Sequence, residues 1–238
     1  MMSEKKKRLV VFDLDGTLLD TIADLAAATN FALASLGYPT HDIDEIRGYV
    51  GNGIGKLLER ALPRNSRNSD TLEKIRHVFV SYYDEHNADL SKPYPGVCDM
   101  LERLQTEGLM LAVASNKYQA ATEKLVARYF PDIRFIAIFG QRTGVPVKPD
   151  PQIVFDIVSQ AGVSLEEVVY VGDSGVDMHT ARHAGVDAIG VAWGFRPRTE
   201  LEAEHPLAVA DEAGNVVDMV LAMMDRSYES QKKNQKNK

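Results

Sequence analysis

The chain has 238 residues, of which 45% are hydrophobic and 26% charged, as is usual for a globular protein with one large or two modest domains. Its formal net charge is −7, which argues against a nucleic-acid partner and means that a small anionic substrate would need local positive groups. Cys98 is the single cysteine, which excludes an intrachain disulfide and favours a reducing compartment. The basic start precedes an apolar run too short for a leader, and no stretch approaches the ~20 apolar residues of a membrane span. We therefore expect a cytoplasmic protein with no membrane partner.

The first predicted element is an apolar strand over residues 9–12 that leads directly into two carboxylates and a Gly-Thr turn. Residues two apart in an extended chain point to the same side, so Asp13 and Asp15 are expected to crowd at the strand end. Two such charges repel each other and raise one pKa unless a cation or the chemistry of a substrate uses them. A strand that merely ended could do so with Asn-Gly or Pro-Gly. The spacing therefore predicts a functional site.

The next seventy or so residues show helical patterns and no strand pattern. The sequence predicts a helix over residues 20–36 with a stop at Gly37. Residues 42–62 hold a short helical stretch, the glycine cluster GNGIG and a second helical stretch, and residues 70–90 repeat the helical pattern. In that last helix, Tyr82 and Tyr83 are interpreted as core and surface residues. The segment SKPYPG then indicates a linker.

From residue 96 onward, apolar strands alternate with helices, which predicts a parallel sheet covered on both faces. Strands are expected over residues 109–115, 135–140, 168–173, 187–193 and 207–210, with helices at about 96–107, from about 117, 150 and 176, and at the end of the chain. The first strand belongs with this set. The predicted fold class is therefore α/β, a Rossmann-like parallel sheet core with an all-helical domain inserted after the first strand.

Polar side chains follow several of the predicted strands at their carboxyl ends, where open α/β sheets bind ligands. Carboxylate oxygens suit Mg²⁺, and a hydroxyl with a lysine suits phosphate oxygens. Each residue taken alone has a simpler explanation, because an Asp or Ser can cap a helix and a lysine can lie on the surface. The residues expected to converge at this edge are Asp13, Asp15, Ser115, Asn116, Lys148, Asp173 and Asp177.

Four motifs stand in order along the chain, namely DLDGT at 13–17, Ser115 in VASNK, Lys148 in KPDP, and GDSGVD at 172–177. With these motifs the chain resembles the haloacid dehalogenase superfamily of aspartyl-nucleophile phosphatases. The helical insertion resembles the small mobile cap of that family, which divides the chain into a core of residues 1–18 and 93–238 and a cap of residues 19–92. Within the insertion, YVGNGIGKLLERAL is similar to a stretch of the bacterial phosphoglycolate phosphatase branch.

The resemblance implies a Mg²⁺-dependent phosphatase for a small phosphorylated metabolite, with 2-phosphoglycolate as the expected substrate. Asp13 would be the nucleophile that forms an aspartyl-phosphate, and Asp15 the acid and base. An Asp13 oxygen, the Asp15 backbone carbonyl and Asp173 would hold Mg²⁺, while Asp177 orients metal-bound water or Lys148. The phosphate-binding residues implied are Ser115, Asn116 and Lys148.

The parts of the site that would select the substrate are less well marked. The candidate contacts in the cap are Arg47, Gly51, Gly53 and Lys56, although a solvated face explains the two cations equally well. The expected assembly is a monomer or a homodimer.

Several alternative functions remain open at this point. A phosphomutase similar to β-phosphoglucomutase shares the fold, cap and motifs, and a pyrophosphatase or a sugar phosphatase would fit as well. A dehalogenase is disfavoured, because that branch lacks the second acid of the first motif and Asp15 is present. A receiver-like signalling module would carry its phospho-acceptor on the third strand, which here ends in Phe139-Gly140. A catalytically silent binding protein would usually have lost a motif acid, and none is lost.

Overall fold

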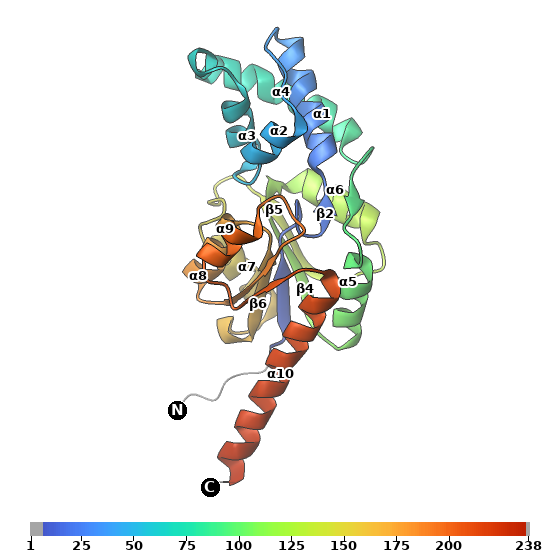
Figure 1. Cartoon of the computed structure of the whole chain (residues 1–238), viewed down its shortest axis with the longest axis vertical. Coiled ribbons are helices and arrows are strands. Elements are labelled where there is room, and N and C mark those ends of the chain that lie inside the picture. Colours follow the sequence, from blue (N-terminus) through green and yellow to red (C-terminus); the bar gives the residue numbers. More distant parts are fainter. Residues whose placement is uncertain (1–6, 237–238) are drawn as a thin grey trace.

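The structure is a computed structural model that describes residues 7–236. Residues 1–6 lie outside the described residues. They include most of the basic N-terminal segment that was considered above as a leader. Figure 1 shows a central sheet flanked by helices, with a separate group of helices at one end of the sheet and the long helix α10 (Ala213–Lys236) extending away from the other end. None of the helices in the described range is long and apolar enough to cross a membrane.

The main sheet has six strands, all paired in parallel, in the order β5-β4-β1-β6-β7-β8. β1 lies between β4 and β6, so that Phe12 is opposite Val113 on one side and Val171 on the other. The chain order reverses on either side of β1, and the end of β1 is therefore the point where such sheets bind ligands. The strands are β1 (Leu9–Phe12), β4 (Met110–Tyr118), β5 (Phe135–Gln141), β6 (Val168–Gly172), β7 (Asp187–Val191) and β8 (Ala208–Ala210).

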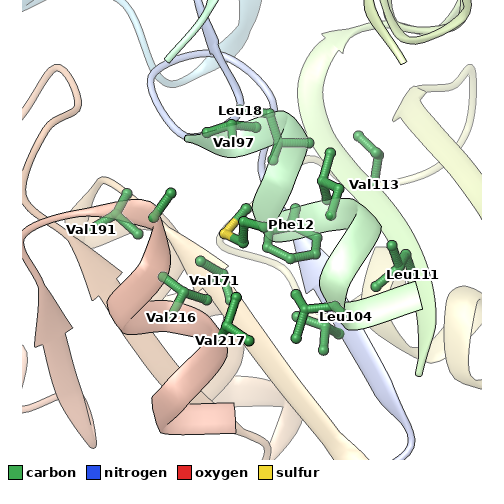
Figure 2. Close-up of a cluster of buried hydrophobic side chains, with 14 of the residues drawn as sticks. Phe12, Leu18, Val97, Leu104, Leu111, Val113, Val171, Val191, Val216 and Val217 are labelled. Carbon is green, nitrogen blue, oxygen red and sulfur yellow. The ribbon is translucent and has the colours of Figure 1, made fainter. Parts of the chain in front are cut away.

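Helices cover both faces of this sheet, as the alternating pattern predicted. Because side chains alternate along a strand, Val10 and Phe12 pack against α5 and α10 on one face, as Figure 2 shows for Phe12 with Leu104 and Val216. Leu9 and Val11 belong to the cluster on the other face, with residues of α7 and α8. The helices of this part are α5 (Val97–Thr106), α6 (Gln119–Tyr129), α7 (Gln152–Ala161), α8 (Gly175–Ala184), α9 (Arg198–Ala203) and α10.

Residues 22–86 form four helices that we call the helical unit. Its members pack around their own buried cluster, which includes Leu33, Leu58 and Phe79 and also Phe195 from the sheet-forming part. The helix predicted over 20–36 is confirmed, and Gly37 follows it with a φ of 75° that favours glycine. The four helices are α1 (Ile22–Ser35), α2 (Ile43–Tyr49), α3 (Gly53–Ala61) and α4 (Ser69–His86).

The chain enters and leaves the helical unit through two short strands, β2 (Leu19–Asp20) and β3 (Lys92–Pro93), that pair antiparallel. Beside them the buried carboxylate of Asp24 accepts hydrogen bonds from the N–H of Leu90 at 3.0 Å and from the N–H and Oγ of Ser91 at 2.8 and 2.6 Å. The predicted linker therefore contains a strand. The segments through which the chain enters and leaves the helical unit are joined by strand pairing and by the hydrogen bonds of Asp24.

Several boundaries differ from the sequence-based expectation, and the largest difference lies between β4 and α6. β4 continues past the predicted end at residue 115 as far as Tyr118, and α6 begins at Gln119. The extension follows an irregularity in register, after which Tyr118 pairs with Gln141 of β5. The short helix α9 was not predicted, because its six residues are too few to show a helical period.

Candidate active site

The site lies at the carboxyl end of β1, where Asp13 follows Phe12. Asp13 Oδ1 is 2.9 Å from Lys148 Nζ and accepts a hydrogen bond of 2.7 Å from the N–H of Leu14. Both contacts involve Oδ1, which leaves Oδ2 as the oxygen available for chemistry. Lys148 reaches Asp13 from the loop between β5 and α7, and its side chain is only 1% exposed. The structure thus brings two of the predicted site residues into direct contact.

Lys148 is held in place by several groups at once. Its ammonium lies 2.8 Å from Asp177 Oδ1 and donates to the carbonyl oxygen of Ala114 at 2.9 Å. Its backbone N–H donates to Asn116 Oδ1 at 2.8 Å. Burial disfavours the charged form, but Asp13 and Asp177 outweigh it and hold the pKa of Lys148 well above its ordinary value. Lys148 therefore stays positively charged at the site.

Two carboxylates contact this lysine, and a third, that of Asp173, lies close to both of them. Asp13, Asp173 and Asp177 each offer one oxygen, and these oxygens lie within 4.8 Å of one another. Burial, and after it the charge of Asp177, raises the pKa of Asp13 to about 7, although Lys148 acts in the opposite direction. Burial and the charges of Asp177 and Asp13 likewise raise the pKa of Asp173 well above its usual range. The cluster has more negative charge than its lysine balances, which suits a divalent cation with oxygen ligands.

The three carboxylates differ in how many partners they already have. Asp177 is fully engaged, since its Oδ1 contacts Lys148 and its Oδ2 accepts a hydrogen bond of 2.6 Å from Ser174 Oγ. Asp173 accepts from the N–H of Phe195 at 2.7 Å and, more weakly, from Thr17 Oγ1 at 3.3 Å. Asp13 and Asp173 are therefore the better placed of the three to hold a cation.

Two glycines make room for Asp173. A Cβ on Gly16 would lie 2.3 Å from Asp173 Oδ2, and its φ is 90°, so both space and backbone conformation require glycine there. A Cβ on Gly194, in the loop after β7, would lie 2.3 Å from the Cβ of Asp173. The glycine of the first motif is thus explained by contact with the fourth motif, whereas Gly194 had no signal in the sequence.

Asp15 belongs to a different group of contacts from Asp13. Both of its carboxylate oxygens lie 3.0 Å from Lys117 Nζ, and Oδ1 accepts a hydrogen bond of 2.7 Å from Thr21 Oγ1. Burial opposes the charge on Lys117, but Asp15 outweighs it and raises the pKa of the ammonium. Sequence reasoning missed Lys117. Its signal was its position next to Asn116, as the last residue of VASNK, the second of the four motifs.

The two remaining predicted phosphate contacts lie on β4. Ser115 is 2% exposed, and its Oγ accepts a hydrogen bond of 3.2 Å from the N–H of Lys117. The Asn116 amide donates to the carbonyl oxygens of Gly51 and Lys148, at 3.0 Å each. Asn116 therefore joins the sheet edge both to the loop of Lys148 and to the helical unit.

A cavity of about 60 Å³ lies between the sheet edge and the helical unit. Because one water needs about 10–15 Å³ on this measure, the cavity suits a small molecule. Its sheet-edge wall carries Asp13, Asp15, Ser115, Asn116, Lys117 and Asp173. Its other wall comes mainly from the helical unit and includes Leu25, Gly51, Gly53, Leu57, Phe79 and Tyr83.

The predicted contacts from the helical unit divide into two pairs. Gly51 and Gly53 line the cavity, as proposed from the sequence. Arg47 and Lys56 do not: Arg47 pairs with Asp44 on its own helix, and Lys56 lies 2.6 Å from Glu59 with its side chain 59% exposed. The structure therefore does not bring the two cations to the cavity.

A further arginine at the cavity was missed. Arg196, in the loop between β7 and α9, donates hydrogen bonds of 2.7 and 2.5 Å to the carbonyl oxygens of Arg47 and Val50. It ties the glycine-rich segment to the sheet edge. Its only signal was that it follows a predicted strand, and the contact itself joins residues about 150 positions apart.

The parallel sheet and the aspartate-centred site at its edge are those expected of a haloacid dehalogenase-like hydrolase, and comparison with known proteins leads to the same class. The family model for haloacid dehalogenase-like hydrolases matches residues 10–191, and the chain belongs to this family. It is 33% identical to a phosphoglycolate phosphatase of Pseudomonas syringae pv. tomato over 91% of this chain and 81% of that protein. It is 32% identical to a phosphoglycolate phosphatase of Vibrio parahaemolyticus, over 92% and 98% of the two chains.

A solved structure supports the same conclusion. A predicted phosphoglycolate phosphatase from Haemophilus somnus 129pt superposes with a TM-score of 0.84 at 26% identity, over 90% of this chain and 98% of that one. The resemblance and the fold class inferred from the sequence are thus confirmed. The chain is a phosphatase, a phosphoric monoester hydrolase of the haloacid dehalogenase-like family.

Proposed function

We propose that this phosphatase hydrolyses 2-phosphoglycolate, with Mg²⁺ and through a phosphorylated Asp13. The observation that carries the mechanism is the position of Asp13, whose Oδ1 is bound by Lys148 while Oδ2 remains available beside a small cavity. The relatives named above, which are phosphoglycolate phosphatases, support the choice of substrate.

In the first step Asp13 Oδ2 attacks phosphorus, and the bond from phosphorus to the ester oxygen breaks. Asp15 gives a proton to the departing oxygen, so that glycolate leaves as the alcohol. In the second step Asp15 takes a proton from water as that water attacks phosphorus, which releases phosphate and restores Asp13. Lys117 and Thr21 hold the Asp15 carboxylate in position for both transfers.

The phosphoryl oxygens would be bound by Ser115, Lys148 and backbone N–H groups near Leu14 and Asn116. Asp13, Asp173 and the backbone carbonyl of Asp15 would hold Mg²⁺, which supplies positive charge to the phosphoryl group and to the crowded carboxylates. Asp177 acts through Lys148, which it keeps charged and directed at Asp13. The charge imbalance of the three-carboxylate cluster supports this assignment.

The helical unit is the natural candidate for the cap, within the division into a core of residues 1–18 and 93–238 and a cap of residues 19–92. Closure over the cavity would exclude water during the transfer and admit only small leaving groups. The paired strands β2 and β3 and the Asp24 contacts would then form its two-stranded connection. A cytoplasmic location and a monomeric or homodimeric state complete the proposal.

The test is a phosphate-release screen of small phosphate esters, with Mg²⁺ and after its removal by EDTA. We expect 2-phosphoglycolate to give the highest kcat/KM, activity to disappear with EDTA, and Asp13→Asn to be folded and inactive. Burst kinetics of alcohol release would reveal the phosphorylated intermediate. A folded Asp13→Asn protein with near-normal turnover would exclude the covalent mechanism, and a clear preference for another ester would exclude the substrate.

A further inference from the structure

The hydroxyl of Tyr83 is buried, and its hydrogen has no acceptor among the described residues. Tyr83 lies in α4 with 1% of its surface exposed, and its Oη makes no hydrogen bond with the described part of the chain. Buried polar side chains are nearly always hydrogen-bonded in native proteins. Since Tyr83 lines the cavity, a group bound there is the natural partner.

The surroundings of the ring supply no acceptor for the hydroxyl, since the neighbouring ammonium of Lys117 can only donate hydrogen bonds. The ring stacks on Phe79 at a centroid distance of 5.3 Å within the cluster of the helical unit, and a phenylalanine would make the same contact. Burial raises the pKa of Tyr83 to about 12, so the hydroxyl is a neutral donor. The packing therefore accounts for the ring but not for the oxygen.

The position of Tyr83 indicates which end of a substrate it would meet. Lys117 Nζ lies 4.8 Å from the centroid of the Tyr83 ring and 3.0 Å from Asp15. Asp15 is the residue that the proposed function places at the leaving-group oxygen, and the inference rests on that function to this extent. Tyr83 and Lys117 thus lie on the side of the cavity where Asp15 would meet the leaving group.

Few other side chains on this side of the cavity could bind a polar group of the substrate. The neighbouring side chains from the helical unit are apolar, namely Leu25, Ile54, Leu57 and Phe79. Arg196 directs an N–H of each of its two terminal nitrogens to the backbone carbonyls of Arg47 and Val50. Arg47 and Lys56 face away, so the positive charge nearest to Tyr83 is that of Lys117.

We propose that Tyr83 determines specificity: its hydroxyl donates a hydrogen bond to an oxygen of the leaving group other than the ester oxygen, beside the positive charge of Lys117. A short phosphorylated acid carries such an oxygen in its carboxylate. A fully apolar leaving group would fit the apolar remainder of the wall but would offer the Tyr83 hydroxyl no acceptor. The buried hydroxyl would then lack a hydrogen bond, and this cost discriminates against such a substrate.

The experiment compares Tyr83→Phe with the wild type on 2-phosphoglycolate and on ethyl phosphate, which lacks the carboxylate. We expect kcat/KM for 2-phosphoglycolate to fall about 10- to 100-fold, the range for one hydrogen bond to a charged group, and that for ethyl phosphate to change less than about twofold. Tyr82→Phe is the matched control, because the Tyr82 ring stacks between Phe31 and His86, 4.3 Å from each, outside the cavity. It should leave both substrates unchanged.

An equal fall for both substrates, or no fall for either, would overturn the role of the hydroxyl. Should the wild type prefer another ester, the proposed substrate fails separately, and the comparison is repeated with that ester and its analogue without the extra oxygen. A Tyr83→Phe effect confined to the oxygen-bearing ester would still support the inference. A preferred ester with no such oxygen, or a wild type with no preference between the pair, would overturn it.

Discussion

The two walls of the cavity are built on different principles. On the sheet edge the charged groups are paired with one another, Lys148 with Asp13 and Asp177, and Lys117 with Asp15. On the wall from the helical unit the side chains are mostly apolar, and the hydroxyl of Tyr83 has no acceptor among the described residues. The difference suggests that the sheet edge carries the chemistry as one coupled network, whereas the helical unit can change its selection of substrates without disturbing those charges.

The largest effect should come from breaking the charged network at Lys148. In Lys148→Met, Asp13 and Asp177 remain buried without their cation, so we expect a loss of stability of about 3–5 kcal/mol and a loss of kcat of at least about 10²–10³-fold. Urea unfolding and phosphate release measure the two quantities. The double variant Lys148→Met/Asp177→Asn should recover part of the stability and none of the activity. A single variant as stable as the wild type would show that the pairing is not needed.

The next test separates two acids on the same wall. Asp15→Asn should lower kcat about 10²–10⁴-fold, the usual contribution of a general acid–base residue, with little change in the Mg²⁺ concentration needed for half-maximal rate. Asp173→Asn should raise that concentration strongly, since its carboxylate lies in the three-carboxylate cluster and that of Asp15 does not. Mg²⁺ titrations of both variants provide the comparison. Equal shifts in the Mg²⁺ requirement would mean that the two roles are wrongly assigned.

A smaller effect is expected where the walls meet. Arg196→Gln removes the charged donor that binds the carbonyl oxygens of Arg47 and Val50, so we expect KM to rise about tenfold with a smaller change in kcat. Arg198→Gln is the matched control, because Arg198 is exposed and pairs with Glu202 and Asp211 on the surface. A fall in kcat alone would place Arg196 in the chemistry and not in the joint between the walls.

The smallest effect should come from the cations that the sequence placed near the substrate. Arg47→Ala and Lys56→Ala should each change kcat/KM for 2-phosphoglycolate by less than about twofold, since exposed ion pairs such as theirs contribute little and neither side chain lines the cavity. Steady-state kinetics on the two variants suffices. A large effect of either would mean that the helical unit rearranges when substrate binds, and that the division between the walls is less sharp.

The sequence by itself determined the α/β sheet, the helical insertion and the set of residues expected at the sheet edge. These depend on local signals: apolar strands alternate with helices, and the carboxyl ends of parallel strands lie on one edge. The meeting of Asp13, Lys148 and Asp173 at that edge follows from this topology. The backbone near Gly37 was also predictable, because a stop after a periodic helix needs no distant partner.

Only the tertiary structure decided how the residues pair and which of them face the cavity. The contacts of Lys117 with Asp15 and of Arg196 with the carbonyl of Val50 join segments that are 102 and 146 positions apart, and no spacing in the sequence encodes them. Tyr83 was predicted as core or surface, and both predictions are incomplete, because the residue packs in the core and also lines the cavity. The reason is physical, since the orientation of a side chain between two packed layers depends on how the helical unit sits on the sheet edge.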